Sequence, residues 1–223
     1  MNAIVWAVNS VRGRGLVQTM KVAASVVVDL SFDWQHGTST MRWVDADEFG
    51  AVGDNLAYSE HYRATKARPL WTLLRSLELP RSSGFVDLGA GKGRVLLTAA
   101  EYGFRKIVGV EFSPKLCEYA RQNIQIFKRR NGAPIEIDIV QSDATTYPIQ
   151  PDQEVFFMFN PFGEVVMAQV LANLRRSVQV APRKIWLIYN TPTQHDLIAR
   201  TGIFRDQFYR NISGTHFRVY SNG

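Results

Sequence analysis

From residue 84 onward, short apolar runs alternate with longer segments whose apolar residues recur at helical spacing. Runs bounded by Gly, Pro, Asn or Asp are typical of buried strands, whereas spacings of three and four residues are typical of helices. We expect helices beginning near residues 95, 114, 166 and 193, and strands at residues 85–87, 106–111, 135–141, 154–160 and 184–189. Two further strands, residues 203–210 and 215–220, are joined by the hairpin-type sequence Asn-Ile-Ser-Gly.

The order of these elements predicts an α/β fold. Strands that alternate with helices form parallel βαβ units. We therefore expect a doubly wound, mostly parallel seven-stranded sheet with a C-terminal antiparallel hairpin strand. A dehydrogenase-type Rossmann sheet usually has six parallel strands and lacks that hairpin. We expect residues 56–223 to form this domain and residues 1–55 to form an N-terminal extension, part helical and part irregular.

The N-terminal extension combines two kinds of sequence. Residues 11–30 are basic and apolar at helix-like spacing, so we expect them to pack on the core or to form a partner surface. Residues 33–55 are rich in Asp, Gly, Ser and Thr, which predicts an irregular lid or a small hairpin. The apolar run that begins at Val22 ends at Asp29, well short of the roughly 20 apolar residues that a membrane-spanning helix needs.

The most informative motif follows the first predicted strand. Asp87 is followed by glycines at positions 89, 91 and 93, and a helix-like segment begins directly afterwards. Glycine permits positive φ and a close approach of a ligand to the backbone, and a helix N-terminus offers unpaired N–H groups. The segment therefore predicts a site for a nucleotide-type ligand where a strand meets a helix.

Two familiar phosphate-binding loops do not fit this spacing. A Walker A loop is excluded because Val86 stands where it needs Gly, and Gly93 stands where it needs Ser or Thr. A dinucleotide fingerprint is excluded because its third glycine falls on Arg94. What remains is the pattern acid-x-Gly-x-Gly-x-Gly, which is complete from Asp87 to Gly93.

This pattern resembles motif I of the class I S-adenosylmethionine (SAM)-dependent methyltransferases, and the downstream spacing agrees with it. Glu111 ends the second predicted strand, where a carboxylate can accept both ribose hydroxyls. For Asp143, after the third strand, the resemblance implies a hydrogen bond to the adenine amino group. The Asn160–Phe162 corner follows the fourth strand, at the position of motif IV beside the transferable methyl group. For Glu111 the alternative is a solvated acid at a strand end, and for Asp143 it is a cap or turn residue. For the Asn160–Phe162 corner it is a turn that ends the strand.

The chain also resembles a poorly characterised group of small bacterial methyltransferases. The shared elements are Phe32-Asp33, Tyr62 with Thr65, residues 87–94 and residues 159–162, although Ala64 replaces a frequent proline. The resemblance implies an enzyme that binds SAM, releases S-adenosylhomocysteine and needs no metal. It implies that the catalytic residues are Asn160, Pro161, Phe162 and Tyr62. The implied cofactor-binding residues are Tyr62, Thr65, Asp87, Leu88, Gly89, Ala90, Gly91, Gly93, Glu111, Phe112, Asp143, Ala144 and Asn160.

The acceptor of the methyl group is less closely defined. In Asn160-Pro161-Phe162, two carbonyl groups can accept hydrogen bonds from an amino group, and the phenyl ring can stack on the acceptor. The aromatic residue stands one position earlier than in the Asn/Asp-Pro-Pro-Tyr/Phe of adenine and glutamine methyltransferases. We expect an amine or hydroxyl of a small molecule or a protein lysine. The alternatives are a nucleic-acid base, or a non-catalytic SAM- or nucleoside-binding regulatory protein. Candidate acceptor-site groups or bases are His61, Tyr189 and His195.

Composition adds three expectations. With 46% hydrophobic and 21% charged residues, the chain is typical of globular proteins. The net charge of +6 includes clusters near predicted helix ends, which we interpret as solvated surface in preference to a nucleic-acid footprint. The single cysteine, Cys117, lies on a predicted core helix and is interpreted as a structural thiol. With one cysteine no internal disulfide can form, so we expect a cytoplasmic protein.

Overall fold

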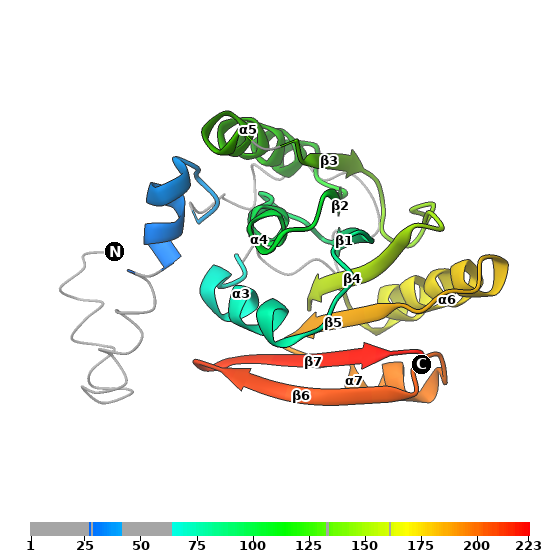
Figure 1. The fold of residues 1–223 in the computed structure, drawn as a ribbon. Coiled ribbons are helices and arrows are strands. Elements are labelled where there is room, and N and C mark those ends of the chain that lie inside the picture. The colour runs from blue at the N-terminus through cyan, green and yellow to red at the C-terminus, as the bar shows by residue number, and fades with distance from the viewer. Residues whose placement is uncertain (1–26, 28, 42–63, 133, 161) are drawn as a thin grey trace.

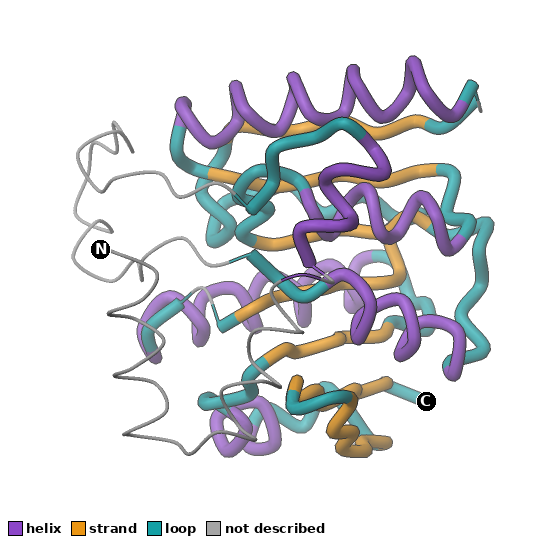
Figure 2. The backbone as a smooth tube through the Cα atoms, turned by 90° about the vertical axis from the view of Figure 1, so that its left-hand side faces the viewer, coloured by secondary structure: helices purple, strands orange, loops and turns teal. Residues whose placement is uncertain are grey.

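The computed structural model describes residues 27, 29–41, 64–132, 134–160 and 162–223. A seven-stranded sheet with the order β3-β2-β1-β4-β5-β7-β6 lies between two layers of helices (Figure 1, Figure 2). Its strands are β1 (Gly84–Leu88), β2 (Lys106–Glu111), β3 (Glu136–Gln141), β4 (Gln153–Phe159), β5 (Trp186–Asn190), β6 (Asp206–Ile212) and β7 (Thr215–Ser221). The helices are α3 (Ala67–Ser76), α4 (Arg94–Tyr102), α5 (Pro114–Asn131), α6 (Glu164–Val180) and α7 (His195–Arg200).

The strand directions confirm the predicted fold class. Strands β1 to β5 pair in parallel with their neighbours, whereas β7 is antiparallel to both β5 and β6. The turn between β6 and β7 places Ser213 and Gly214 at φ 51° and 75°. Two consecutive residues with positive φ match the twist of a tight hairpin. The protein therefore has a doubly wound sheet that ends in an antiparallel hairpin.

Alternation along the strands divides the core between the two faces of the sheet. Phe85 and Phe157 pack with residues of α3, α4 and α5. Their neighbours Val86 and Phe156 point the other way and pack with residues of α6 and α7. Because both faces are covered, the central strands read as nearly continuous apolar runs. The helices thus occupy opposite layers on the two faces of the sheet (Figure 2).

Local signals account for the helix termini. The Ser113 hydroxyl accepts a hydrogen bond from the backbone N–H of Leu116, and Pro114 follows at the first helical position. Helix α4 ends at Gly103, which has φ 117°. Cys117 is buried on α5, and burial raises the pKa of its thiol to about 11. Cys117 is therefore a buried thiol, not an activated one.

Some boundaries differ from those predicted from the sequence. Residues 29–36 are helical, so residues 33–36 are not part of an irregular lid. Strand β6 begins at Asp206, because Ile203 and Phe204 pack against the core beneath the sheet and do not pair with β7. Most of the predicted helix 11–30 and of the predicted lid lies outside the described residues.

Candidate cofactor and acceptor site

The predicted site elements meet at the carboxyl edge of the parallel strands. Strands β3, β2, β1 and β4 are consecutive in the sheet, so the segments that follow them lie next to one another. Leu88 of β1 pairs with Met158 of β4. Ala90 and Asn160 each follow two residues later, which brings the glycine-rich loop and the Asn160 corner side by side. In Figure 1 the carboxyl ends of β4 and β5 are marked by their arrowheads, which point to the left.

The glycine-rich loop has the conformation that its glycines suggest. Gly89, Gly91 and Gly93 have φ values of 89°, 53° and 85°, a region that other residues adopt only with strain. The backbone N–H groups of Gly89 and Ala90 donate to the carbonyl of Val110 at 2.9 and 3.0 Å. These bonds fasten the loop to the end of β2, and Gly93 leads directly into α4.

A residue on β2 determines how closely this loop lies against the sheet. A Cβ atom at Gly109 would come within 2.7 Å of the Ala90 Cβ and 2.5 Å of the Ile139 Cδ1. Real Cβ atoms do not approach so closely, so a larger residue would displace the loop. Gly109 is not among the residues predicted for the site, although a glycine within a predicted strand is a known signal of close approach.

The Glu111 carboxylate closes the loop from the next strand. Its Oε2 accepts the backbone N–H of Gly91 at 2.8 Å, and its Oε1 accepts that of Ser113 at 3.0 Å. The side chain is buried. Burial raises the pKa of Glu111, although the hydrogen bonds from Ser113, Gly91 and Phe112 oppose that rise. Each carboxylate oxygen has two lone pairs, so both can still accept a ligand hydroxyl.

Asp87 is the second buried carboxyl group at this point. It is 2% exposed. Burial, together with the nearby charge of Glu111, raises the pKa of Asp87 well above its ordinary value. Two buried carboxylates beside one loop are electrostatically unfavourable without a cation. A positively charged ligand next to this loop would therefore be attracted.

The segment after β3 forms a turn around Asp143. The Asp143 Oδ1 accepts the backbone N–H and the hydroxyl of Thr145, both at 2.8 Å. Ala144 is buried beside it, whereas the Phe112 side chain after β2 is 39% exposed. The turn role that the sequence left open for Asp143 is thus present. It leaves the second carboxylate oxygen outside the Thr145 contacts.

Asn160 is held in a strained conformation at the end of β4. Its φ is 37°, which is uncommon for a residue other than glycine. Its side-chain Oδ1 accepts the hydroxyl of Tyr189 at 2.8 Å and also the hydroxyl of Thr193. Both donors come from β5 and the segment that follows it. This differs from the sequence-based interpretation, in which that oxygen accepts from the methyl acceptor.

Of the remaining residues predicted for the site, some lie within the described residues and others do not. Thr65 is buried directly before α3, and Phe162 packs against the core that includes α6. His195 begins α7, and its Nδ1 lies 2.9 Å from the Tyr220 hydroxyl. Tyr62, His61 and Pro161 lie outside the described residues.

Comparison with known proteins shows what part of the chain resembles. Residues 85–180 match the family model of a methyltransferase domain. The ribosomal protein L11 methyltransferase of Tolumonas auensis is 27% identical over 134 residues, which make up 60% of this chain and 38% of that protein. The chain thus matches less than half the length of this curated relative.

Two solved structures share the fold. A proposed RNA methyltransferase from Pyrococcus horikoshii has a TM-score of 0.55 and 13% identity, over 89% of this chain and 97% of that one. Human N-acetylserotonin methyltransferase, in complex with SAM, has a TM-score of 0.51 and 15% identity, over 70% and 51%. Residues 85–180 are thus similar to a methyltransferase domain, and the fold is that of solved methyltransferases. The cofactor of this family is SAM.

The residues around the glycine-rich loop fit this cofactor. SAM carries a sulfonium and an ammonium group, and Asp87 and Glu111 place two buried carboxyl groups beside the loop, whose charged forms a nearby cation would favour. The positive φ values of Gly89, Gly91 and Gly93, which have no side chains, let a ligand approach the backbone of the loop closely. The donor set and the shape of the loop therefore agree with a cationic nucleoside.

Arg94 is a residue beside the glycine-rich loop whose role the sequence did not indicate. It follows Gly93 directly, and its side chain is 2% exposed. Its guanidinium donates to the backbone carbonyl of Asp29 at 2.5 Å and to the Thr40 hydroxyl at 2.9 Å. It also forms ion pairs with Asp29 at 3.5 Å and Asp33 at 3.7 Å, and lies 4.7 Å from the Phe32 ring centroid.

Asp33 organises the segment that contacts Arg94. Its carboxylate accepts hydrogen bonds from the side chains of Thr38 and Thr40 and from the backbones of Thr40 and Met41. Burial alone would raise the pKa of Asp33, but these hydrogen bonds hold it below its ordinary value. The Phe32-Asp33 element is therefore a fixed part of the structure, attached to the helix that begins at the cofactor loop.

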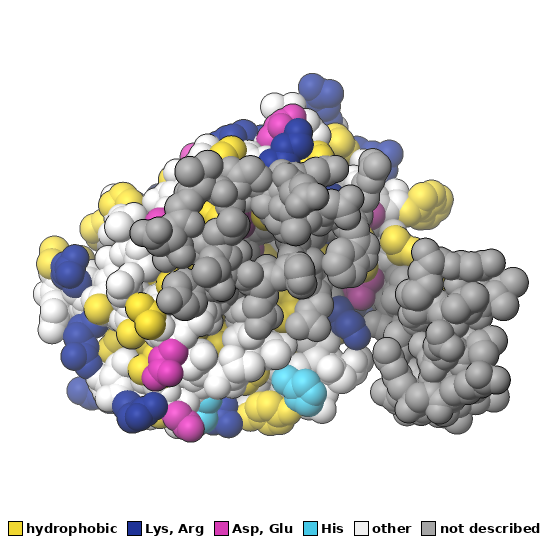
Figure 3. Space-filling model, turned by 180° about the vertical axis from the view of Figure 1, so that it is seen from behind, with side chains coloured by type: hydrophobic (Ala, Val, Ile, Leu, Met, Phe, Trp, Pro, Cys, Tyr) yellow, Lys and Arg dark blue, Asp and Glu magenta, His cyan; other side chains and the backbone are white. Residues whose placement is uncertain are grey.

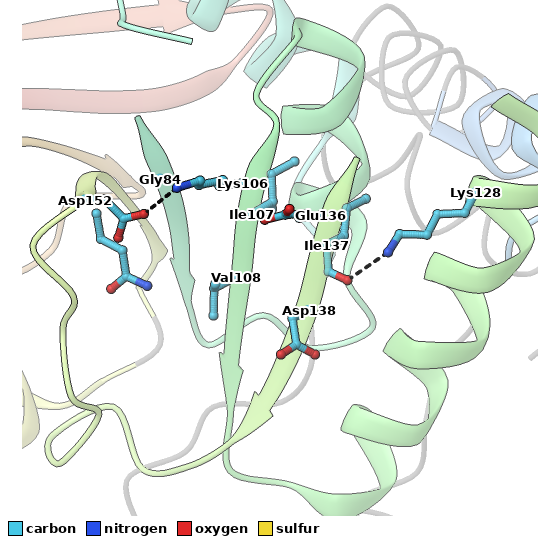
Figure 4. Close-up of a pocket in the computed structure, with 10 residues that line it drawn as sticks. Gly84, Lys106, Ile107, Val108, Lys128, Glu136, Ile137, Asp138 and Asp152 are labelled. Atoms are coloured by element: carbon cyan, nitrogen blue, oxygen red, sulfur yellow. Dashed lines mark hydrogen bonds and ion pairs between the residues drawn. The ribbon is translucent and has the colours of Figure 1, made fainter. Parts of the chain in front are cut away.

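A pocket of about 460 Å³ lies at the opposite edge of the sheet, lined by the first residues of β1, β2, β3 and β4 (Figure 4). Lys106 Nζ pairs there with Asp152 Oδ2 at 3.0 Å, and Lys128 Nζ donates to the Ile137 carbonyl at 3.2 Å. Its position separates it from the cofactor loop. The described residues contain no cluster of three metal-ligating side chains. No helix among them is long and apolar enough to span a membrane.

Proposed function

We propose that this protein transfers the methyl group of SAM to a nucleophile held beside Asn160. The observation that carries the proposal is the pairing of β1 with β4, which sets the cofactor loop next to the Asn160 corner. SAM supplies a methyl group activated by the sulfonium. The contribution of the chain is positioning, which can remove about 7–11 kcal/mol of an activation barrier.

The proposal assigns roles to the residues at the strand ends. Glu111 accepts the ribose hydroxyls, and Asp87 complements the positive charge of the cofactor. Asp143 and Phe112 contact the adenine, and Thr65 with Tyr62 borders the pocket. The buried, electrostatically unfavourable pair Asp87 and Glu111 supports the assignment, because a cation would offset its repulsion.

Ligand specificity tests this assignment directly. We expect SAM and S-adenosylhomocysteine to raise the melting temperature of the purified protein, because a ligand that binds only the folded state stabilises it. NAD and ATP should give no comparable shift, since the loop lacks their fingerprints. Stabilisation by NAD without any by SAM would contradict the proposal.

The Asn160 side chain supports a role in positioning the methyl acceptor. Two hydroxyl donors, Tyr189 and Thr193, occupy its Oδ1, so its amide N–H₂ is the group oriented by this contact. That group donates hydrogen bonds, which suits an oxygen or a ring nitrogen near the reacting atom. An amine acceptor would instead need the Pro161 carbonyl that the sequence suggested.

Asn160→Ala tests this role. We expect the variant to keep its SAM affinity within about tenfold and to lose most of its turnover, because catalysis depends on contacts made in the transition state. Asn131→Ala, at the end of α5, is a matched control. Transfer of labelled methyl from SAM into fractionated cell extract is the readout. Full activity of Asn160→Ala would remove this corner from the mechanism.

The same experiment addresses the acceptor class. The sequence favours a small molecule or a protein lysine, and the similarity to a ribosomal protein L11 methyltransferase supports a protein acceptor. Label in the protein fraction or the small-molecule fraction would agree with these alternatives. SAM binding without label in any fraction would instead favour a regulatory SAM-binding protein.

A further inference from the structure

The hairpin formed by β6 and β7 extends the sheet next to the Asn160 corner. Tyr189 of β5 pairs with Arg218 of β7, and the Thr191 N–H donates to the His216 carbonyl at 2.8 Å. The hairpin turn therefore lies beyond the carboxyl end of β5, on the same edge as the cofactor loop. Strand β6 is the outer strand of the sheet (Figure 1).

Three side chains on one face of this hairpin form a continuous group, here called the hairpin patch: Tyr209, His216 and Arg218. The rings of Tyr209 and His216 stack with centroids 5.9 Å apart and planes at 29°, and the tyrosine hydroxyl is hydrogen-bonded to the histidine Nδ1. The Arg218 guanidinium lies 6.0 Å from the Tyr209 ring centroid. Tyr209 is 45% exposed. In the view from behind, histidine, hydrophobic, basic and acidic side chains lie along the lower margin of the molecule (Figure 3).

The positive charge of Arg218 has no carboxylate partner among the described residues. Its guanidinium donates to Gln207 Oε1 at 3.1 Å and contacts His195 Nε2 at 3.0 Å. Because arginine can only donate, the His195 Nε2 accepts, and its Nδ1 carries the proton directed at Tyr220. From His195 to Ser221 the chain has four arginines and two aspartates. The hairpin patch is thus a partly exposed surface that carries a positive charge and aromatic rings.

We propose that the hairpin patch docks a single-stranded nucleic acid. A base or sugar of that strand would then be the methyl acceptor, in place of the small molecule or protein lysine that the sequence favours. An exposed ring pair lets unpaired bases stack, and an arginine without a carboxylate partner contacts phosphate. A lysine-rich protein segment would be repelled by the same charge. The role of the nucleic acid as methyl acceptor depends on the methyl transfer proposed above. Its docking on the hairpin patch does not depend on that proposal.

The test measures binding by fluorescence anisotropy, with labelled single-stranded RNA and DNA of about 12 nucleotides and the corresponding duplexes. We expect the wild-type protein to bind the single strands more tightly than the duplexes. Tyr209→Ala should weaken that binding about tenfold, or about 1.4 kcal/mol, and Tyr209→Phe should largely retain it. Arg218→Gln should reduce the slope of log affinity against log salt by about 0.7.

The controls separate docking from the proposed function. Arg129 is an exposed arginine on α5, away from the hairpin patch. Arg129→Gln should therefore not produce the loss of single-strand binding that Tyr209→Ala produces. The affinity for SAM, measured separately, should stay unchanged in all variants. No single-strand binding by wild-type protein, equal binding of duplex, or an equal loss in Arg129→Gln would overturn the proposal. Failure to bind SAM would overturn methyl transfer and leave the docking result intact.

Discussion

At the scale of single residues, the site is governed by two buried carboxyl groups, Asp87 and Glu111. The Glu111 carboxylate is satisfied by backbone N–H groups of the loops after β1 and β2. For Asp87 the dominant effects are burial and repulsion by Glu111, and both raise its pKa. A buried carboxyl group with a strongly raised pKa lowers the stability of the folded chain in its charged form. Such a group is expected to have a function, such as binding a ligand.

The raised pKa of Asp87 predicts a pH-dependent effect of Asp87→Asn. A carboxyl group with a raised folded pKa favours folding below its unfolded pKa of about 4, and that contribution is lost as pH rises through the folded pKa. The neutral Asn avoids this loss. Without SAM, the variant should therefore melt at a higher temperature than the wild type at pH 8, and the difference should shrink toward pH 4.

The same variant should gain less stability from added SAM, because the negative charge is missing. Thermal unfolding across this pH range, with and without SAM, measures both effects. Asp138→Asn, an exposed acid on β3, is the control. If Asp87→Asn were less stable than wild type at pH 8 and bound SAM equally well, the electrostatic argument would be wrong.

Glu111 differs from Asp87 because its carboxylate oxygens already accept hydrogen bonds from backbone N–H groups. Glu111→Ala should weaken SAM binding by about 1.5–3 kcal/mol for each charged ribose hydrogen bond that is lost. It should also lower the stability of the ligand-free protein, since the N–H groups of Gly91 and Ser113 lose their acceptor. Calorimetric titration and urea unfolding measure the two effects. Unchanged SAM affinity would place the ribose contact elsewhere.

At the scale of elements, the decisive contact joins the helix at residues 29–36 to the start of α4. Arg94 spans this interface and is almost wholly buried. Asn123 of α5 adds a second attachment, because its Oδ1 accepts the Ser39 N–H at 2.9 Å and its Nδ2 donates to the Lys92 carbonyl at 3.0 Å. Both attachments reach the cofactor loop or the residue beside it.

Arg94→Met should release this segment. Removing one partner of a buried ion pair costs about 3–5 kcal/mol, because the other charge is left uncompensated. We expect faster amide hydrogen exchange in residues 29–41 and a weaker SAM affinity. Arg94→Lys should give a partial loss, because it keeps the charge without the planar fork. Unaltered exchange protection in Arg94→Met would show that the segment is held by other contacts.

At the scale of the whole molecule, the candidate site groups on the described strand ends share one edge of the sheet. The cofactor loop, the Asn160 corner and the hairpin turn follow strands that end there, and residues 29–41 reach the same edge through Arg94. We propose that these N-terminal residues belong to the folded domain and are not a separate extension. The boundary at residue 55 that the sequence suggested would then cut through a cooperative unit.

Deletion of residues 1–41 tests this. The shortened protein should unfold at a lower urea concentration and bind SAM more weakly, because Arg94, Asn123 and Arg130 all lose partners in the deleted segment. Equilibrium unfolding and calorimetric titration give the two values. Equal stability and equal affinity of the shortened protein would restore the boundary near residue 55.

The sequence alone determined most of the fold and the location of the cofactor loop. Alternating apolar runs, the Ser113-Pro114 helix start and the glycines from 89 to 93 are local signals, and they act over a few residues. Tertiary structure alone decided the pairing of Arg94 with Asp29 and Asp33, the closure of the loop by Glu111, and the contact of Asn160 with Tyr189 and Thr193. These partners are far apart in the chain, and only the folded sheet brings them within hydrogen-bonding distance.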